Sequence, residues 1–170
     1  MKQKNLAVEL LRKLLNDEIK TRSRTFLVQS RSFAEMLARA IAEYHNRTIE
    51  TLEVIERLIK LAEEMRKSAQ RGEKLKLSPE ELAFYDALET NDSAVKVLGD
   101  EVLRAIAREV ADKIRNNVSI DWTMKESVRA KLRVLVKRVL RNHGYPPDKQ
   151  EKATKTVLEQ AELIAPRWAA

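Results

Sequence analysis

The sequence predicts an all-α protein, a single helical domain over residues 1–170 with about six to seven antiparallel-packed helices. The composition is rich in Leu, Ala, Glu, Lys and Arg and contains only three Gly and four Pro, which is typical of helical proteins. Apolar residues also recur three and four positions apart in nearly every segment, and no alternating strand pattern of useful length occurs. A chain of this size buries about 70% of its unfolded surface, so the absence of cysteine is no obstacle to folding.

The first part of the chain predicts three helices. A row of leucines indicates the first one: Leu6, Leu10, Leu11, Leu14 and Leu15. Ser32 and Glu35 have capping-box spacing, so the second helix is expected to start there. A long third helix follows Thr48, and its apolar residues cover about half of the circumference. That arc is wider than the ~100° stripe of a surface helix, so this helix is expected to pack against two neighbours.

The second part shows clear helix boundaries. Ser78 and Pro79, followed by two glutamates, predict a capped helix start, and Gly99 interrupts the chain before the next apolar run. Thr123 and Glu126 again have capping-box spacing and open a basic helix. Stop signals follow it, and a last helix is expected to run to about Pro166; the stops are Gly144, Pro146 and Pro147. Four aromatic residues are interpreted as core anchors: Phe26, Phe84, Tyr85 and Trp122.

The net charge of +7 is unevenly distributed. Residues 1–71 hold 15 basic and 10 acidic side chains, residues 72–112 hold 5 and 10, and residues 113–170 hold 13 and 6. An acidic centre between two basic ends indicates separate surface patches of the kind that meet DNA, RNA or acidic proteins.

The basic helix after Thr123 is the strongest candidate for a contact surface. After Glu126 it contains no acid before Asp148, whereas exposed helices usually mix both signs of charge. Its apolar residues fall on one side of a helical wheel, and the predicted partner or DNA contacts lie on the other side or, for Arg129, at the boundary: Arg129, Lys131, Arg133, Lys137, Arg138 and Arg141. Three interpretations stay open here, namely a contact with nucleic-acid phosphates, a contact with an acidic protein surface, and an ordinary solvated face.

Residue types exclude several kinds of site. Gly72, Gly99 and Gly144 are too far apart for a phosphate-binding loop, so no ATP or dinucleotide loop is expected. With two histidines, His45 and His143, and no cysteine, no metal site is expected either; each histidine is interpreted as a partner for carbonyls at a helix end. The residues from Pro147 to Lys152 resemble a PD…ExK nuclease motif only faintly and are interpreted as a helix start. Catalytic, cofactor-binding and metal-binding residues are therefore predicted to be absent.

Targeting signals are not apparent. The first twenty residues lack an apolar signal region, and no run approaches the roughly 20 apolar residues of a membrane span. The prediction is a cytoplasmic protein with no membrane contact.

Several stretches together resemble one known family: FLVQSRSFAEML, YHNRTIET, LSPEELAFYDAL, VLGDE and IDWTMKESVRAKLRVLVKRVLRNHGYPPDKQEKA. They are similar to the C-terminal helical domain of the restriction (R) subunit of type I restriction–modification enzymes. The similarity extends from about Leu6 to Trp168, and the last stretch is its most specific part. The resemblance implies a C-terminal fragment of a much longer subunit, whose chain starts well before Met1.

In that family the R subunit carries a nuclease domain and two ATP-driven motor domains that move DNA. The resemblance implies that this chain is not an enzyme by itself, although its parent is an ATP-dependent deoxyribonuclease with ATP and Mg²⁺ bound in the missing domains. The implied role is docking the R subunit onto the core of methyltransferase and specificity subunits, in restriction of foreign DNA.

Two other functions remain as alternatives. A stand-alone basic helical module would bind DNA or RNA directly. A helical-bundle metal enzyme is disfavoured, since paired Glu-x-x-His motifs are missing.

Overall fold

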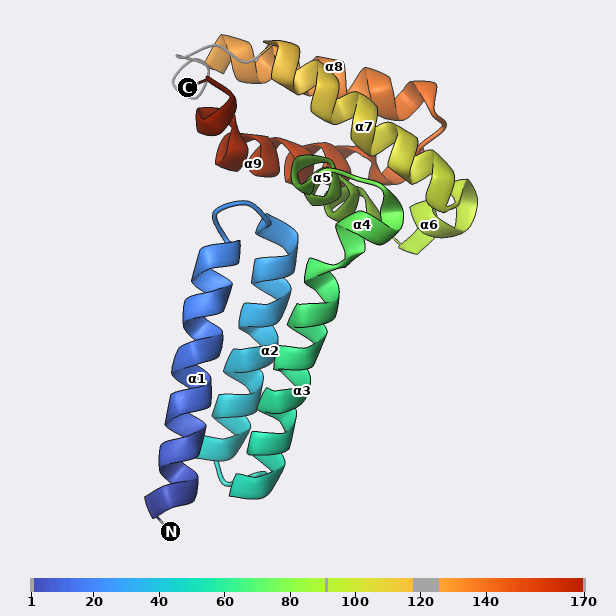
Figure 1. Ribbon diagram of the computed structural model, residues 1–170. Coiled ribbons are helices and arrows are strands. Elements are labelled where there is room, and N and C mark those ends of the chain that lie inside the picture. Colours follow the sequence, from blue (N-terminus) through green and yellow to red (C-terminus); the bar gives the residue numbers. More distant parts are fainter. Residues whose placement is uncertain (1, 91, 118–125, 170) are drawn as a thin grey trace. The chain divides into compact units, whose positions relative to one another are not determined.

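The computed structural model describes residues 2–90, 92–117 and 126–169, and the side chains of residues 5–90, 94–117 and 126–168. The chain divides into two compact units, residues 1–71 and residues 72–170, and each is described by itself. Helices, turns and short connections account for the described residues, without a strand among them. The prediction of an all-α fold is confirmed (Figure 1). The expectation of one domain over residues 1–170 stays a prediction.

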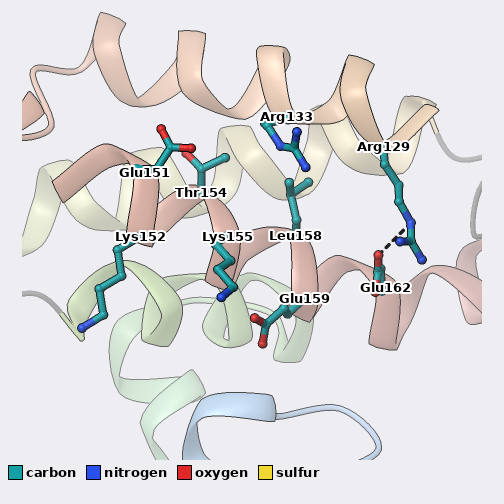
Figure 2. A pocket seen from close by; sticks show the side chains of 9 residues that line it. All are labelled: Arg129, Arg133, Glu151, Lys152, Thr154, Lys155, Leu158, Glu159 and Glu162. Carbon is teal, nitrogen blue, oxygen red and sulfur yellow. Dashed lines mark ion pairs between the residues drawn. The ribbon is translucent and has the colours of Figure 1, made fainter. Parts of the chain in front are cut away.

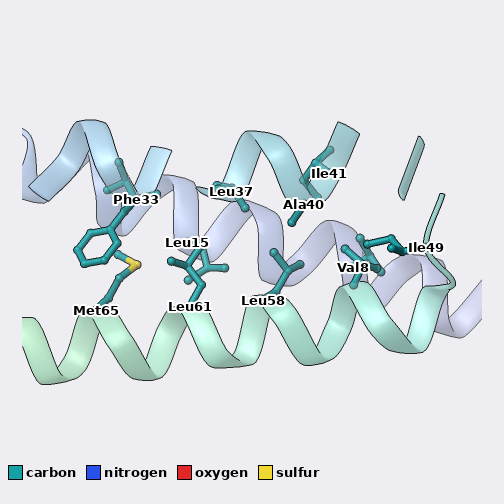
Figure 3. Close-up of a cluster of buried hydrophobic side chains, with 12 residues drawn as sticks. Val8, Leu15, Phe33, Leu37, Ala40, Ile41, Ile49, Leu58, Leu61 and Met65 are labelled. Carbon is teal, nitrogen blue, oxygen red and sulfur yellow. The ribbon is translucent and has the colours of Figure 1, made fainter. Parts of the chain in front are cut away.

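The first unit is an antiparallel bundle of three helices, in which each helix packs against the other two (Figure 1). They are α1 (Lys2–Arg22), α2 (Leu27–His45) and α3 (Thr51–Ala69). Figure 3 shows the core between them, with Val8 and Ile49 towards one end and Phe33 beside Met65 at the other. The expectation that the third helix has two neighbours is confirmed, because α3 contacts both α1 and α2.

Helix α1 carries apolar residues on two opposite faces. Val8, Leu15 and Ile19 are buried against α2 and α3. Three members of the predicted row instead point to solvent and form what we call the leucine stripe: Leu6, Leu10 and Leu14, with exposed fractions of 71%, 58% and 57%. The predicted first helix is confirmed, but its leucines do not share one environment, because the buried face of α1 is set by packing against α2 and α3.

The predicted start of the second helix at Ser32 is also wrong. Helix α2 begins at Leu27, five residues before Ser32. Its N-cap residue is Phe26, which makes no side-chain hydrogen bond to the helix end. The residues from Leu27 to Arg31 have helical geometry themselves, so Ser32 lies inside the helix rather than at its end. A capping-box spacing is therefore not sufficient where a helix-compatible sequence precedes it.

The second unit is built around a short central helix, α5 (Pro79–Glu89), which packs against α7 (Asp100–Asn117) and α9 (Gln150–Ala169). The seven consecutive residues from Leu82 to Leu88 in α5 are buried, so this helix is covered on all sides. Helix α8 (Glu126–Asn142) packs against α7 and α9 (Figure 1). Two short helices, α4 (Arg71–Leu75) and α6 (Asp92–Leu98), bring the described helices above the six to seven expected.

Several predicted boundaries of this unit are confirmed. The Ser78 hydroxyl accepts a hydrogen bond from the Glu81 amide at 3.2 Å, and the Glu81 carboxylate accepts one from the Ser78 amide at 2.8 Å, which completes the capping box. Gly99 and Gly144 have φ angles of 79° and 77°, a backbone conformation that residues other than glycine rarely adopt. Gly144 follows α8, and Pro147 opens a single 3-10 turn, η2 (Pro147–Lys149), before α9.

Other expectations about this unit have mixed outcomes. Pro166 does not end the last helix, since α9 continues to Ala169; in the last turn a proline removes a single helical hydrogen bond. Phe84 and Tyr85 are buried as expected, whereas Phe26 of the first unit is only half-buried. The Thr123 cap and the Trp122 anchor lie outside the described residues.

Candidate partner-binding surfaces

The six predicted contact residues of α8 separate into two groups. Leu132, Val136, Val139 and Leu140 form the buried side of the helix. Arg129, Arg133 and Lys137 follow one another at intervals of one turn along the side facing α9, where they or their partners line a cleft. The other three are exposed on the outer side, around the exposed Val134: Lys131, Arg138 and Arg141.

Two residues of the inner group are neutralised by α9. The Arg129 guanidinium lies 2.9 Å from a Glu162 oxygen, and the Lys137 ammonium lies 2.9 Å from a Glu151 oxygen. The hydrogen bond from Lys137, and then its charge, lower the pKa of the Glu151 carboxyl, and the charge of Arg133 adds to this effect. The basic helix has no acid of its own after Glu126, but the neighbouring helix supplies two.

The remaining predicted contacts are not held in close ion pairs. Arg133, Lys131, Arg138 and Arg141 form no ion pair with any residue that the structure describes. Of these, Arg133 points into the space between α8 and α9, whereas the other three lie on the outer side. The single arc inferred from the sequence is therefore two surfaces with different neighbours.

The cleft between α8 and α9 has a volume of about 520 Å³. Figure 2 shows Arg133 reaching from α8 towards Leu158, while Thr154 rises from α9 towards α8. Thr154 is only 2% exposed, and its Oγ1 has no hydrogen-bond partner in the described part of the chain. Buried polar atoms normally have such partners, so this hydroxyl is an unused donor and acceptor at the edge of the cleft.

Sequence reasoning missed the α9 residues of this cleft and the exposure of the leucine stripe. Thr154 and Leu158 are individually ordinary in a helix, and only the pairing of α8 with α9 brings them opposite Arg133. The leucine stripe did have a signal in the sequence. Val8, Leu15 and Ile19 define a second apolar face on the same helix, opposite Leu6 and Leu10.

The two histidines have different surroundings. His143 Nε2 lies 2.5 Å from a Glu109 carboxylate oxygen of α7, so the expected contact with terminal carbonyls is wrong for this residue. His45 is the last residue of α2. In the described part of the chain, no three His, Asp or Glu side chains gather in a way that suits a metal ion. Of the helices described there, none is both long and apolar enough to cross a membrane.

The chain matches one protein family along almost its entire length. Residues 1–167 match the family described as "Type I restriction enzyme HindI endonuclease subunit-like, C-terminal". The chain belongs to this family. The resemblance proposed from the five sequence stretches is thereby confirmed.

Two relatives carry names from the same class of enzyme. The chain is 44% identical over 162 residues to the "Type I restriction enzyme HindI endonuclease subunit" of Haemophilus influenzae, covering 95% of this chain and 15% of that protein. It is 34% identical over 142 residues to the "Putative type I restriction enzyme MjaIXP endonuclease subunit" of Methanocaldococcus jannaschii, covering 83% of this chain and 14% of that protein. The chain thus spans about one seventh of each relative's length. No solved structure matches it significantly.

Proposed function

We propose that this domain is the non-catalytic docking domain of a type I restriction enzyme endonuclease subunit. It attaches that subunit to the core of methyltransferase and specificity subunits in the cytoplasm, during restriction of foreign DNA. Membership of the C-terminal family supports the assignment to an endonuclease subunit of a type I restriction enzyme. The leucine stripe of α1 is the observation that supports the docking role.

The leucine stripe favours a protein partner. Leu6, Leu10 and Leu14 are spaced by four residues, which makes a continuous ridge of the kind that packs into a groove of another helix. A shallow groove beside the ridge is also lined by Glu9, Arg12 and Lys13, which gives it a polar rim. Burying a leucine side chain contributes about 1.5–3 kcal/mol, so covering three that are more than half exposed contributes roughly 3–5 kcal/mol. Contiguous apolar surface of this kind marks interaction sites.

Catalysis is assigned to the parts of the enzyme outside this domain. We expect ATP and Mg²⁺ to act in motor and nuclease domains, while this domain needs no cofactor. The wide separation of Gly72, Gly99 and Gly144 supports the assignment of ATP binding to other domains, because a phosphate-binding loop requires glycines within a few positions of one another.

The docking role is tested by a capture experiment with a matched control. The cognate methyltransferase–specificity core is immobilised, and this domain is added as the parent, as Leu10→Glu and as Leu52→Glu. Leu10 and Leu52 are exposed to 58% and 56%, in α1 and α3 of the same unit, so the two substitutions add the same charge at equally exposed positions. We expect Leu10→Glu to weaken capture at least tenfold and Leu52→Glu to leave it unchanged. Equal capture of all three proteins would exclude the leucine stripe as the docking surface.

The outer side of α8 supports the alternative, a module that binds DNA or RNA directly. Lys131, Arg138 and Arg141 are exposed there and form no ion pair within the described part of the chain. If these three neutralise three phosphates of duplex DNA, log affinity falls with log salt at a slope of about −2.7. Such a slope for the domain alone, lost on Arg138→Glu, would favour this alternative; salt-independent, millimolar binding would exclude it.

A further inference from the structure

We propose that the cleft between α8 and α9 binds an acidic side chain of a protein partner, with Arg133 and Thr154 holding the carboxylate and Leu158 contacting a neighbouring aliphatic side chain. This inference deepens the proposed docking function and rests on it, because it states what kind of peptide segment the partner presents.

The ion pairs between the two helices leave one position unfilled. Helices α8 and α9 are antiparallel, and Arg129, Arg133 and Lys137 face α9 at successive turns. The first and third bases meet Glu162 and Glu151 at 2.9 Å. Opposite the middle base lie Leu158 and Thr154, neither of which is an acid (Figure 2). Arg133 thus stands where a carboxylate from another molecule completes the series.

Thr154 supplies the second half of this position. The residue is 2% exposed, and its Oγ1 has no hydrogen-bond partner among the residues that the structure describes. An ionised carboxylate only accepts hydrogen bonds, and Arg133 and the Thr154 hydroxyl are both donors. One carboxylate between them gives the buried hydroxyl an acceptor, and it gives the Arg133 guanidinium, which otherwise acts on Glu151 by charge alone, a hydrogen-bonded partner.

The surroundings of the cleft favour a single carboxylate over a nucleic-acid backbone. Three glutamates line the same cleft, Glu151, Glu159 and Glu162, beside four bases, Arg129, Arg133, Lys152 and Lys155, so a run of phosphates passing through it would meet acids as well as bases. One carboxylate avoids this repulsion, since Glu151 and Glu162 are held at the two ends by Lys137 and Arg129. Leu158 offers apolar surface beside Arg133, which suits an aliphatic residue next to the acid. The volume of about 520 Å³ lies in the ordinary range of ligand sites and admits two side chains.

The test compares two peptides that differ in one charge. The 170-residue chain is titrated with acetyl-Glu-Leu-amide and with acetyl-Gln-Leu-amide, and nuclear magnetic resonance follows the amide of Thr154 and the methyl groups of Leu158. We expect saturable shifts with the Glu peptide and at least tenfold weaker binding of the Gln peptide. Equal responses to both peptides, or no response to either, would overturn the proposal.

Variants then assign the binding to the two residues. Arg133→Gln is expected to weaken the Glu peptide at least tenfold, and Thr154→Val, which keeps the volume of the side chain, a few-fold. Arg138→Gln is the control, because it removes the same charge from the outer side of α8 and leaves peptide affinity unchanged. Unchanged affinity of the Glu peptide for a folded Arg133→Gln protein would contradict the proposal. A duplex oligonucleotide that shifts the same Thr154 and Leu158 resonances, with the same dependence on Arg133, would also contradict it.

The two proposals fail in different ways. If the methyltransferase–specificity core captures the domain but neither peptide binds, the carboxylate site is refuted and the docking function is still supported. If the Glu peptide binds in a way that depends on Arg133 but the core does not capture the domain, the carboxylate site is supported and the proposed partner is refuted.

Discussion

Two adjacent leucines of α1 give a sharp test of which face of this helix is buried. Leu15 is 6% exposed and lies in the core of the first unit (Figure 3). Leu14 is 57% exposed on the leucine stripe. Leu15→Ala removes about three buried carbon groups at about 0.8 kcal/mol each and leaves a cavity, so its expected cost is about 2.5–4 kcal/mol. Leu14→Ala leaves no cavity, and the better helix propensity of alanine offsets part of the loss, so its cost is about 1 kcal/mol or less.

Urea unfolding followed by circular dichroism measures both changes in the 170-residue chain. The substitution, the helix and the neighbouring sequence are the same, so the difference isolates burial. We expect the transition of the first unit to move at least twice as far for Leu15→Ala as for Leu14→Ala. Similar shifts for the two variants, or the larger shift for Leu14→Ala, would refute the assignment of the buried face and with it the leucine stripe.

The other predictions concern two contacts of the second unit and the activity of the whole domain. Ser78→Ala removes the capping box of α5 and should cost about 1 kcal/mol of unfolding free energy, measured by urea unfolding; a loss below about 0.3 kcal/mol would show that the cap contributes nothing. The pKa of Glu151 is lowered by Lys137, so the pair stabilises the fold above the ordinary carboxyl pKa and loses this effect as pH falls through the lowered pKa. Lys137→Gln should raise the pKa of Glu151 in a nuclear magnetic resonance titration, whereas Lys152→Gln should not. The isolated domain should neither hydrolyse ATP nor cut DNA with Mg²⁺ present; turnover that scales with domain concentration through repurification would contradict this.

The helical class and several boundaries follow from local sequence signals, because these signals act over a few residues. The serine cap at Ser78 is followed by proline and two acids and is preceded by residues that do not continue a helix, and the structure confirms it. At Ser32 the same spacing fails, because the residues from Leu27 onwards already form a helix and leave no free end for the cap. A capping motif therefore predicts a helix start only together with what precedes it.

Contacts between two helices cannot be predicted from the sequence of either helix alone. The sequence of α8 contains no acid after Glu126, yet Glu151 and Glu162 of α9 neutralise two of its bases. The orphaned hydroxyl of Thr154 becomes visible only once α9 is packed and its exposure is known. The family, by contrast, was accessible from the sequence, since the matching stretches extend through most of the chain.

The central claim is that this domain attaches the endonuclease subunit to the methyltransferase–specificity core, and competition tests it most directly. The core is mixed with the full-length endonuclease subunit in the presence of increasing amounts of the isolated domain, and size-exclusion chromatography measures how much full-length subunit enters the complex. We predict that the domain displaces the full-length subunit in a saturable way and that Leu10→Glu abolishes this competition. Full incorporation of the endonuclease subunit at saturating concentrations of a folded domain would contradict the account.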